Sequence, residues 1–591
     1  MRTRCSSAQT MSLFFDHLLD FSFPDRYNLF MPMHKPVIKT PVASSYFAAQ
    51  PAVSAGERRP AIGLVICTLA FLACILLTVT PLIRMPDSLF RLHMSWGAFL
   101  GEASLWLPAN LGKAYLKSSA SIEFFSLITL AFVCHCLGAW LVGRWPEKIS
   151  WTSARACIWL GVIVAGAIYV VTPGILSHDT MVYAGYSRLL AVYHANPYFA
   201  FYSAFPRDPL ASFDQWSNVN SLYGPIWMLV CAALGQFVRP TPESYIIAFR
   251  LFALSMHLLN MWLVDRALYT MVHSKRVRAL GMLLYGWNPL VLLESSLNGH
   301  NDVFMLTFVL LGVLLVARAE QRGELLRVRG YLPPLVALTL AALVKFTILP
   351  VLAAYLLFLA CKASQPTSES SQDWKQTLNN WRPTALLLLW SCLVAVLVAL
   401  AFYGPFWFGH NLHAIIESFA GNPASGFAEN SYQRSIINWL HFHPALQSNF
   451  VLLFLSWRKV WDSINYLVIV LCLILGARHI WEKPTVRAFL ELALAIMCLV
   501  LLLTPWFFTW YITWIVGLAV VCLPAKRSRF AWSFFFLALA FSYSALSLYL
   551  FNQGLLGSRG YLTSLFDTVP PICAFLFCWF WYPRLRAKPV K

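Results

Sequence analysis

The chain of 591 residues is poor in charge. Only 12% of its residues are Asp, Glu, Lys or Arg, against roughly 25% in soluble globular domains, whereas 59% are hydrophobic. Acidic residues are scarcer than basic ones, at 25 against 44, which gives a net charge of +19. The basic residues lie in short clusters between apolar segments, so they indicate membrane topology and not a nucleic-acid partner. The composition predicts a polytopic membrane protein.

Several catalytic motifs are also missing. The sequence has no P-loop, no Gly-x-Gly-x-x-Gly fingerprint and no His-Glu-x-x-His pair, so nucleotide hydrolysis and zinc proteolysis have no support. None of the 14 cysteines forms a Cys-x-x-Cys pair, and most lie inside apolar segments, which is typical of small buried residues. Residues 1–56 show no secretory signal peptide and are predicted to be a flexible cytoplasmic tail.

The apolar segments predict an all-α bundle of about fourteen transmembrane helices. Glu57-Arg58-Arg59 precedes the first segment, and the positive-inside rule therefore places this end of the chain in the cytoplasm. The basic clusters of alternate later loops agree, so we expect both termini to be cytoplasmic. The predicted spans are 61–82, 121–142, 154–175, 245–271, 280–297, 303–316, 331–344, 347–360, 383–408, 463–480, 486–504, 508–523, 530–550 and 567–582.

Segment 223–238 is apolar but shorter than the roughly 20 residues that a span requires. If it crossed the membrane, the basic loop 273–278 would lie outside, against the positive-inside rule. We therefore predict a membrane-lying helix within an outer loop. The predicted divisions are two additional helices in 57–153, a core in 154–446 with large outer loops at 176–243 and 409–446, and C-terminal helices in 447–591.

Asp179 directly follows the predicted span 154–175 and therefore lies where a membrane helix meets water. A carboxylate costs less there than at the bilayer centre and can still reach a lipid headgroup. It could serve as a general base towards a lipid-linked substrate, or it could cap the following helix, since Asp favours N-cap positions. The local residues leave both readings open.

The predicted topology gathers polar side chains on the outer face. Lys345, Arg250 or Arg434 would neutralise a phosphate leaving group, Asp179 would accept a hydroxyl proton, and nearby aromatic rings would stack on sugars. Cations that snorkel and aromatics that form an interfacial belt are the plainer alternatives. No cofactor is required, although a divalent cation between Asp179 and Asp302 is left open. The gathered groups are Asp179, Asp208, Asp214, Glu243, Arg250, His300, Asn301, Asp302, Lys345 and Arg434, with Glu294 one turn below, and the rings are Tyr183, Tyr186, Tyr198 and Trp216.

An ordered set of motifs carries a family resemblance. The motifs are Leu176-Ser177-His178-Asp179, Ala195-Asn196-Pro197-Tyr198, Tyr223-Gly224-Pro225, Asn288-Pro289-Leu290, Gly299-His300-Asn301-Asp302 and Ala342-Leu343-Val344-Lys345. Together they resemble the polyprenol-phosphate-mannose-dependent α-(1→6)-mannopyranosyltransferases of the GT-C superfamily, over about residues 154–361. The later Thr504–Tyr511 segment is similar to a Pro-Trp-Tyr segment of that family. The chain departs from the family pattern at His178, where Arg is usual, and at Glu294, in a stretch that is usually apolar and Gly-rich.

The resemblance implies a GT-C-like bundle whose acidic residue after the first core span, Asp179, is the catalytic base. The substrate-binding residues that it implies are His178, Tyr183, Asn196, Tyr198, Tyr223, Arg250, Asn288, His300, Asn301, Asp302, Lys345 and Arg434. The expected activity is an inverting transfer of a sugar, mannose above others, from a polyprenyl-phosphate donor to a glycan or glycolipid acceptor on the extracytoplasmic face of the cell membrane. A transporter or flippase of a lipid-linked glycan is the alternative.

Overall fold

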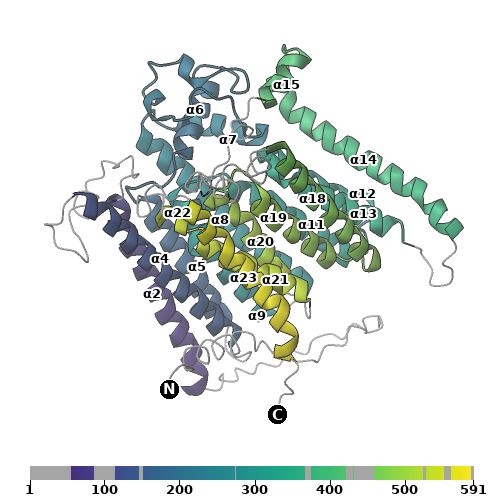
Figure 1. Cartoon of the computed structure of the whole chain (residues 1–591), viewed down its shortest axis with the longest axis horizontal. Helices are drawn as coiled ribbons and strands as arrows, with labels where there is room; N and C mark the ends of the chain where they lie inside the picture. The colour runs from purple at the N-terminus through teal and green to yellow at the C-terminus, as the bar shows by residue number, and fades with distance from the viewer. Residues whose placement is uncertain are drawn as a thin grey trace, which may run out of the picture.

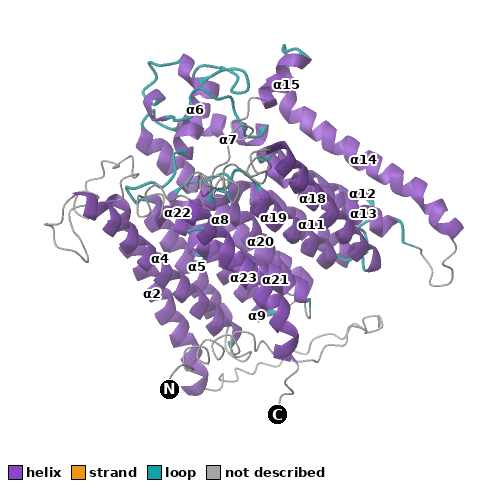
Figure 2. Cartoon of the chain, in the orientation of Figure 1, coloured by secondary structure: helices purple, strands orange, loops and turns teal. Residues whose placement is uncertain are grey.

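The computed structural model describes residues 55–84, 113–145, 151–272, 274–365, 374–420, 430–431, 439, 458–523, 528–550 and 561–586. Helices and connecting loops make up these residues, and no β-strand occurs among them (Figure 2). Within the same ranges, ten helical segments are long and apolar enough to cross a membrane. The prediction of an all-α polytopic membrane protein is therefore confirmed, while the number of fourteen spans stays a prediction.

The ten candidate spans come from helices whose bounds lie close to most of the predicted segments. They are α2 (Ala55–Arg84), α4 (Lys113–Gly143), α5 (Trp151–Val170), α8 (Pro242–Val272), α11 (Asp302–Gln321), η4 with α13 (Phe346–Ile348, Leu349–Ala363), α14 (Trp374–Trp407), α18 (Arg458–Glu482), α19 (Val486–Leu503) and α21 with α22 (Arg529–Ser544, Ser547–Leu550). Shorter apolar helices are α7 (Pro225–Phe237), α12 (Val328–Val344), η7 with α20 (Thr509–Tyr511, Ile512–Cys522) and the middle of α23 (Tyr561–Arg586).

The connecting loops separate to the two ends of the bundle. At one end the Arg276 guanidinium donates to the carbonyl of Trp145, and Lys362 donates to the carbonyl of Pro484. The start of α2 and the end of α23 lie at this end in Figure 1. The helices α6 (Asp179–Ala191), α7 and α15 (Leu412–Ala420) lie together at the opposite end. The basic loops and the predicted outer loops are thus on opposite ends, as the sequence pattern requires.

Helix α7 is thirteen residues long, which is too short to cross a bilayer. Its start is attached to the end of α12, because the Gly224 N–H donates to the carbonyl of Val344. A Cβ on Gly224 would lie 2.0 Å from the carbonyl oxygen of Leu343, so only glycine permits this approach. Of the second predicted outer loop, α15 is described, whereas Arg434 lies outside the described residues.

The predicted continuous span 280–297 is wrong. The chain forms α9 (Lys275–Gly286), a break, the short α10 (Pro289–Leu292) and the π-helix η3 (Leu293–Leu297). Asn288 causes part of the break, because its side-chain oxygen accepts from the Leu290 and Val291 N–H groups as the N-cap of α10. Pro289 follows at the first helical position, where its missing N–H is not needed.

The predicted span 154–175 is also too long, since α5 ends at Val170. Thr172 precedes Pro173, and a residue before proline is disfavoured in the helical conformation. The carbonyls released at this helix end are collected by Arg250, whose guanidinium donates to Val170, Thr172 and Gly174. The loop after α5 is thereby fixed, and it delivers Asp179 to the start of α6.

The predicted spans 331–344 and 347–360 form a helical hairpin, with Lys345 between them. Helices α12 and α13 run antiparallel, as shown by the hydrogen bond from the Tyr355 hydroxyl to the Tyr331 carbonyl. Lys345 itself has an extended backbone between α12 and η4.

Candidate active site

Asp179 is the first residue of α6, and its carboxylate is aimed at aromatic hydroxyls. Its Oδ2 accepts from the Tyr223 hydroxyl at 3.2 Å and from the Tyr183 hydroxyl at 3.4 Å. The N-cap residue of α6 is His178, and no side-chain cap bond forms there. The two phenol contacts and the 17% exposure of the Asp179 side chain leave a carboxylate that is held in place and still reachable.

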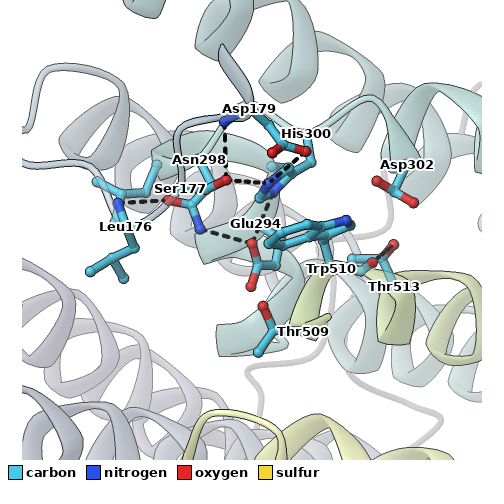
Figure 3. A network of polar contacts seen from close by, with 12 residues as sticks. Leu176, Ser177, Asp179, Glu294, Asn298, His300, Asp302, Thr509, Trp510 and Thr513 are labelled. Atoms are coloured by element: carbon cyan, nitrogen blue, oxygen red, sulfur yellow. Dashed lines mark hydrogen bonds and ion pairs between the residues drawn. The ribbon is translucent and has the colours of Figure 1, made fainter. Parts of the chain in front are cut away.

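His300 lies between Asp179 and a second carboxylate, Glu294 (Figure 3). Its Nδ1 is 2.9 Å from Oε2 of Glu294, and its Nε2 is 3.0 Å from the Ser177 hydroxyl and 3.9 Å from Oδ2 of Asp179. The imidazole ring stacks on Trp510, with 4.1 Å between the ring centroids. These contacts fix the plane of the ring and direct each nitrogen towards one side of the network.

Glu294 is fully buried below His300 and has two further polar partners besides that histidine. Tyr549 donates its hydroxyl to Oε1 at 2.6 Å, and Asn298 donates its amide to Oε2 at 2.8 Å. The Asn298 carbonyl oxygen in turn accepts from the Leu176 N–H, which ties the network to the loop that carries Asp179.

Charge explains the protonation of His300. Burial lowers the pKa of His300, but Glu294, and more weakly Asp179 and Asp302, outweigh it and raise that pKa above its ordinary value. The imidazole is therefore held towards its charged form, and this form donates from both nitrogens.

Lys345 forms the second part of the site with Asp302. Its ammonium is 2.8 Å from Oδ1 of Asp302, which also accepts from the Trp514 indole N–H at 2.7 Å. The ammonium lies 4.4 Å from the Tyr511 ring centroid and 5.9 Å from that of Tyr223. Tyr223 therefore contacts the carboxylate of Asp179 through its hydroxyl and faces the cation of Lys345 with its ring.

Asn196 and Tyr198, two predicted binding residues, support this ring from behind. The Tyr198 hydroxyl donates to the backbone carbonyl of Tyr223 at 2.9 Å. The Asn196 side chain accepts from the Tyr198 N–H and donates to the carbonyl of Phe406 on α14. Their contacts position Tyr223 between Asp179 and Lys345.

Two other predicted binding residues have structural contacts. Arg250 is fully buried, and its guanidinium donates to four backbone carbonyls of the described chain. Three belong to the end of α5 and the loop after it, and the fourth is that of Leu297, so these bonds already satisfy the guanidinium. Asn288 is also fully buried, caps α10 and donates to the Ser542 hydroxyl. We therefore leave both outside the proposed phosphate and sugar contacts.

Asn301 behaves differently. It is buried, and neither polar atom of its amide has a hydrogen-bond partner within the described part of the chain. A buried amide without a partner is energetically costly, so a ligand that bonds to it would be favoured, and Asn301 stays a predicted substrate-binding residue.

The carboxylates of the loop before α7 have separate surroundings. Asp208 accepts from Arg188, Tyr193 and Tyr202; burial raises its pKa, but these bonds outweigh burial and lower it overall. Asp214 is buried with the Trp216 N–H as its partner, and burial raises its pKa to about 6.

The sequence left open a divalent cation between Asp179 and Asp302. Oδ1 of Asp302 already contacts an ammonium and an indole N–H. Within the described ranges, no group of three or more His, Cys, Asp or Glu residues is arranged to hold a metal ion.

The sequence motifs missed the contributions from the far end of the chain. Trp510, Tyr511, Trp514 and Tyr549 all contact the residues described above, although none was assigned to the site. The Thr504–Tyr511 segment, with its Trp and Tyr residues after Pro505, was the available signal. Nothing in the neighbourhood of Tyr549 points to Glu294, which lies 255 residues earlier.

Residues 88–361 match the family model described as Alpha-(1->6)-mannopyranosyltransferase, N-terminal domain. No curated protein matches the chain. The resemblance identified from the motifs is confirmed over the matched residues, which include Asp179, Tyr223, His300, Asp302 and Lys345. The match supports a membrane glycosyltransferase that transfers mannosyl groups.

Proposed function

We propose that the protein is an inverting glycosyltransferase that uses a polyprenyl-phosphate-linked sugar, mannose above others, on the extracytoplasmic face of the membrane. The acceptor is a hydroxyl of a glycan or glycolipid. The match to a mannopyranosyltransferase domain supports mannose as the transferred sugar. The predicted topology supports the face, because the candidate site lies at the end of the bundle opposite the basic loops.

One observation carries the proposal: Tyr223 contacts both Asp179 and Lys345. Transfer from a sugar phosphate needs a base for the incoming hydroxyl and a cation for the departing phosphate, on opposite sides of the anomeric carbon. A single tyrosine lies between the two groups here, so a base and a cation stand on either side of one residue.

The reaction conserves atoms and charge with these residues alone. The acceptor oxygen attacks C1 of the sugar while Asp179 takes the hydroxyl proton. The bond between C1 and the phosphate oxygen breaks, and its electron pair stays on polyprenyl phosphate, whose negative charge is stabilised by Lys345. Attack opposite the leaving group inverts C1, so a β-linked donor gives an α-linked product.

The direct test uses purified full-length protein with synthetic β-linked polyprenyl-phosphate mannose and a short mannan acceptor. We expect an α-linked product and one polyprenyl phosphate released for each sugar transferred. A β-linked product would contradict inversion. Movement of the lipid-linked sugar across proteoliposomes without transfer would overturn the enzyme and favour the transporter alternative.

The face is tested separately by labelling single cysteines in a background that lacks the native ones. Asn218→Cys lies in the exposed loop before α7, and Gln321→Cys lies at the exposed end of α11 at the opposite end of the bundle. We expect a membrane-impermeant maleimide to label the first from outside and the second only after permeabilisation. The reverse pattern would contradict the proposed face.

A further inference from the structure

Glu294 is a fully buried acidic residue close to Asp179 to which the proposed transfer gives no role. Burying a carboxylate is costly unless it is paired and hydrogen-bonded. Its partners are the Tyr549 hydroxyl, the Asn298 amide and the imidazole of His300, of which only His300 can carry a positive charge.

The local backbone is built to bring Glu294 and His300 together. Glu294 lies in the π-helix η3, and π-helical turns often occur at functional sites. Gly299 has a φ of +68°, in the left-handed region that glycine tolerates, and it turns the chain back over η3. The His300 N–H consequently donates to the Glu294 carbonyl at 3.1 Å, and the side chains of the two residues meet.

The far side of the imidazole faces Asp179. Ser177 lies between them, since its hydroxyl accepts from the Asp179 N–H at 3.3 Å and is 3.0 Å from Nε2 of His300. Trp510 covers the ring face and prevents the imidazole from turning away. A charged imidazole in this position attracts the carboxylate form of Asp179 and restricts its orientation.

We propose that Glu294 and His300 are positioning residues: Glu294 keeps His300 protonated and oriented, and His300 holds Asp179 as an oriented carboxylate ready to accept the acceptor proton. This inference rests on the proposed function, in which Asp179 is the base. Neither residue touches the sugar. Glu294 acts through His300, and His300 acts through Asp179.

The charges around His300 set the expected pH response. Asp179 of α6, Glu294 of η3, Asp302 of α11 and Tyr549 of α22 face this network, and Lys345 offsets the charge of Asp302. Removing the Glu294 charge leaves burial as the main influence on the pKa of His300, which then falls. The imidazole becomes neutral at a lower pH, and its attraction for the side chain of Asp179 is lost.

The experiment compares the pH profile of transfer for wild type and Glu294→Gln, which keeps the shape of the side chain. We expect kcat at neutral pH to fall about tenfold, and the acidic limb of the profile to move up by about one pH unit, the size of one lost neighbouring charge. The donor KM should stay within about twofold of wild type. An unshifted limb, with uniform loss at every pH, would overturn the proposal and leave Glu294 a purely structural residue.

Two further variants keep the test decisive. Tyr549→Phe removes a hydrogen bond to Glu294 but no charge, so we expect a small loss of kcat and an unmoved acidic limb. An equal shift in Tyr549→Phe would rule out charge as the cause.

Glu491→Gln is the matched control, because Glu491 of α19 also pairs with a histidine, His479 of α18, at 3.3 Å. This pair lies at the other end of the bundle. The profile of Glu491→Gln should equal that of wild type.

A second readout does not depend on transfer. The pKa of His300 is raised in the folded state, so its charged form stabilises the fold fully below the unfolded pKa and loses this effect as pH rises through the folded value. The melting temperature of wild type should therefore fall across that range more than that of Glu294→Gln. Equal slopes would overturn the Glu294–His300 couple, whereas absence of transfer by wild type would overturn only the proposed function.

Discussion

The two carboxylates on either side of Tyr223 differ in what surrounds them. The Asp179 side chain is 17% exposed and contacts two phenol hydroxyls. The Asp302 side chain is 1% exposed and contacts the Lys345 ammonium and an indole N–H. A general base must be reachable by the substrate and must be able to gain a proton without breaking an ion pair. Asp179 is the more exposed carboxylate, and its charged neighbour His300 is 3.9 Å away, whereas Asp302 is buried and 2.8 Å from the Lys345 ammonium.

A similar contrast separates the matched region from the C-terminal part. Residues 88–361 supply the charged groups Asp179, Glu294, His300, Asp302 and Lys345. The C-terminal helices supply aromatic partners that cover these groups, among them Trp510 on His300 and Trp514 on Asp302. The ion pair and the imidazole are therefore shielded only when both parts are packed together, and the matched region alone is an incomplete site.

The largest effect is expected from Asp179→Asn. The amide keeps the size of the side chain and its contacts with Tyr223 and Tyr183 but cannot take a proton. Turnover should fall by about 10²–10⁴-fold, the contribution of a general base, with normal expression, melting temperature and donor binding. Rates of sugar transfer from the labelled donor measure this directly.

Asp302→Asn is the counterpart on the buried side. We expect weaker donor binding or lower stability, because Lys345 loses its partner, but a turnover well above that of Asp179→Asn at saturating donor. If Asp179→Asn stays active while Asp302→Asn is inactive, the base lies in the Gly299–Asp302 loop and the assignment of roles is reversed.

Lys345→Met should be the next largest change. It removes the cation that would face the donor phosphate and leaves Asp302 as an uncompensated buried carboxylate. We expect the donor affinity to fall by about 10- to 100-fold, comparable to a charge-assisted hydrogen bond, together with a lower melting temperature. Calorimetry with the donor and thermal unfolding separate the two consequences.

The double variant Lys345→Met with Asp302→Asn sharpens this result. Removing both charges takes away the unpaired carboxylate, so the melting temperature should recover towards wild type while donor affinity stays low. Recovery of donor affinity in the double variant would show that Lys345 serves only to neutralise Asp302.

The sequence predicted much of this arrangement because hydropathy and charge act locally. Apolar segment lengths placed most of the spans, and the single lysine of segment 331–360 marked the turn between α12 and α13. The same rules failed at 280–297, where Asn288 and Pro289 break a segment that hydropathy alone reads as continuous. The backbone contacts of Arg250 were missed for a related reason, since no local pattern shows that the carbonyls after α5 need a donor.

Side-chain contacts between helices that are distant in sequence could not be predicted from the sequence. Lys345 has no acidic neighbour in sequence, yet it pairs with Asp302 43 residues earlier. Trp514 meets Asp302 over 212 residues, and hydropathy carries no information on which faces of two spans pack together. Identifying which of the two carboxylates is paired with a cation therefore required the contacts of Asp179 and Asp302.

Tyr223→Phe should produce a moderate effect that tests the connection between the two carboxylates. The change removes the hydroxyl that donates to Asp179 but keeps the ring that faces Lys345. One hydrogen bond to a charged group contributes about 1.5–3 kcal/mol, so we expect roughly a tenfold or greater loss of kcat with little change in donor KM. A loss confined to donor KM would place Tyr223 with the phosphate and not with the base.

Asp214 gives the smallest expected effect and a third case for the comparison. Like Asp302 it is buried, but the partner it has in the described structure is the Trp216 N–H, and burial, with a smaller contribution from Asp179, raises its pKa to about 6. Between pH 4 and pH 6 the folded loop therefore binds more protons than the unfolded one. Its contribution to stability is present at low pH and lost as pH rises through about 6.

We therefore expect the loop before α7 to be cleaved several-fold faster by a broad-specificity protease at pH 7.5 than at about pH 5, after correction for protease activity. Asp214→Asn cannot ionise and should flatten this dependence, so that its loop is the more resistant one at neutral pH. Asp208→Asn is the opposing control, because hydrogen bonds from Tyr202, the Leu210 N–H, Tyr193 and Arg188 outweigh burial and lower the pKa of Asp208. Loss of this carboxylate should weaken the loop at neutral pH. Asp214 packs against Gly185 of α6, where a Cβ would lie 2.6 Å from its Oδ2, so this loop lies close to the helix that begins at Asp179. Equal cleavage of wild type and Asp214→Asn at both pH values would show that ionisation of the buried Asp214 does not weaken the loop.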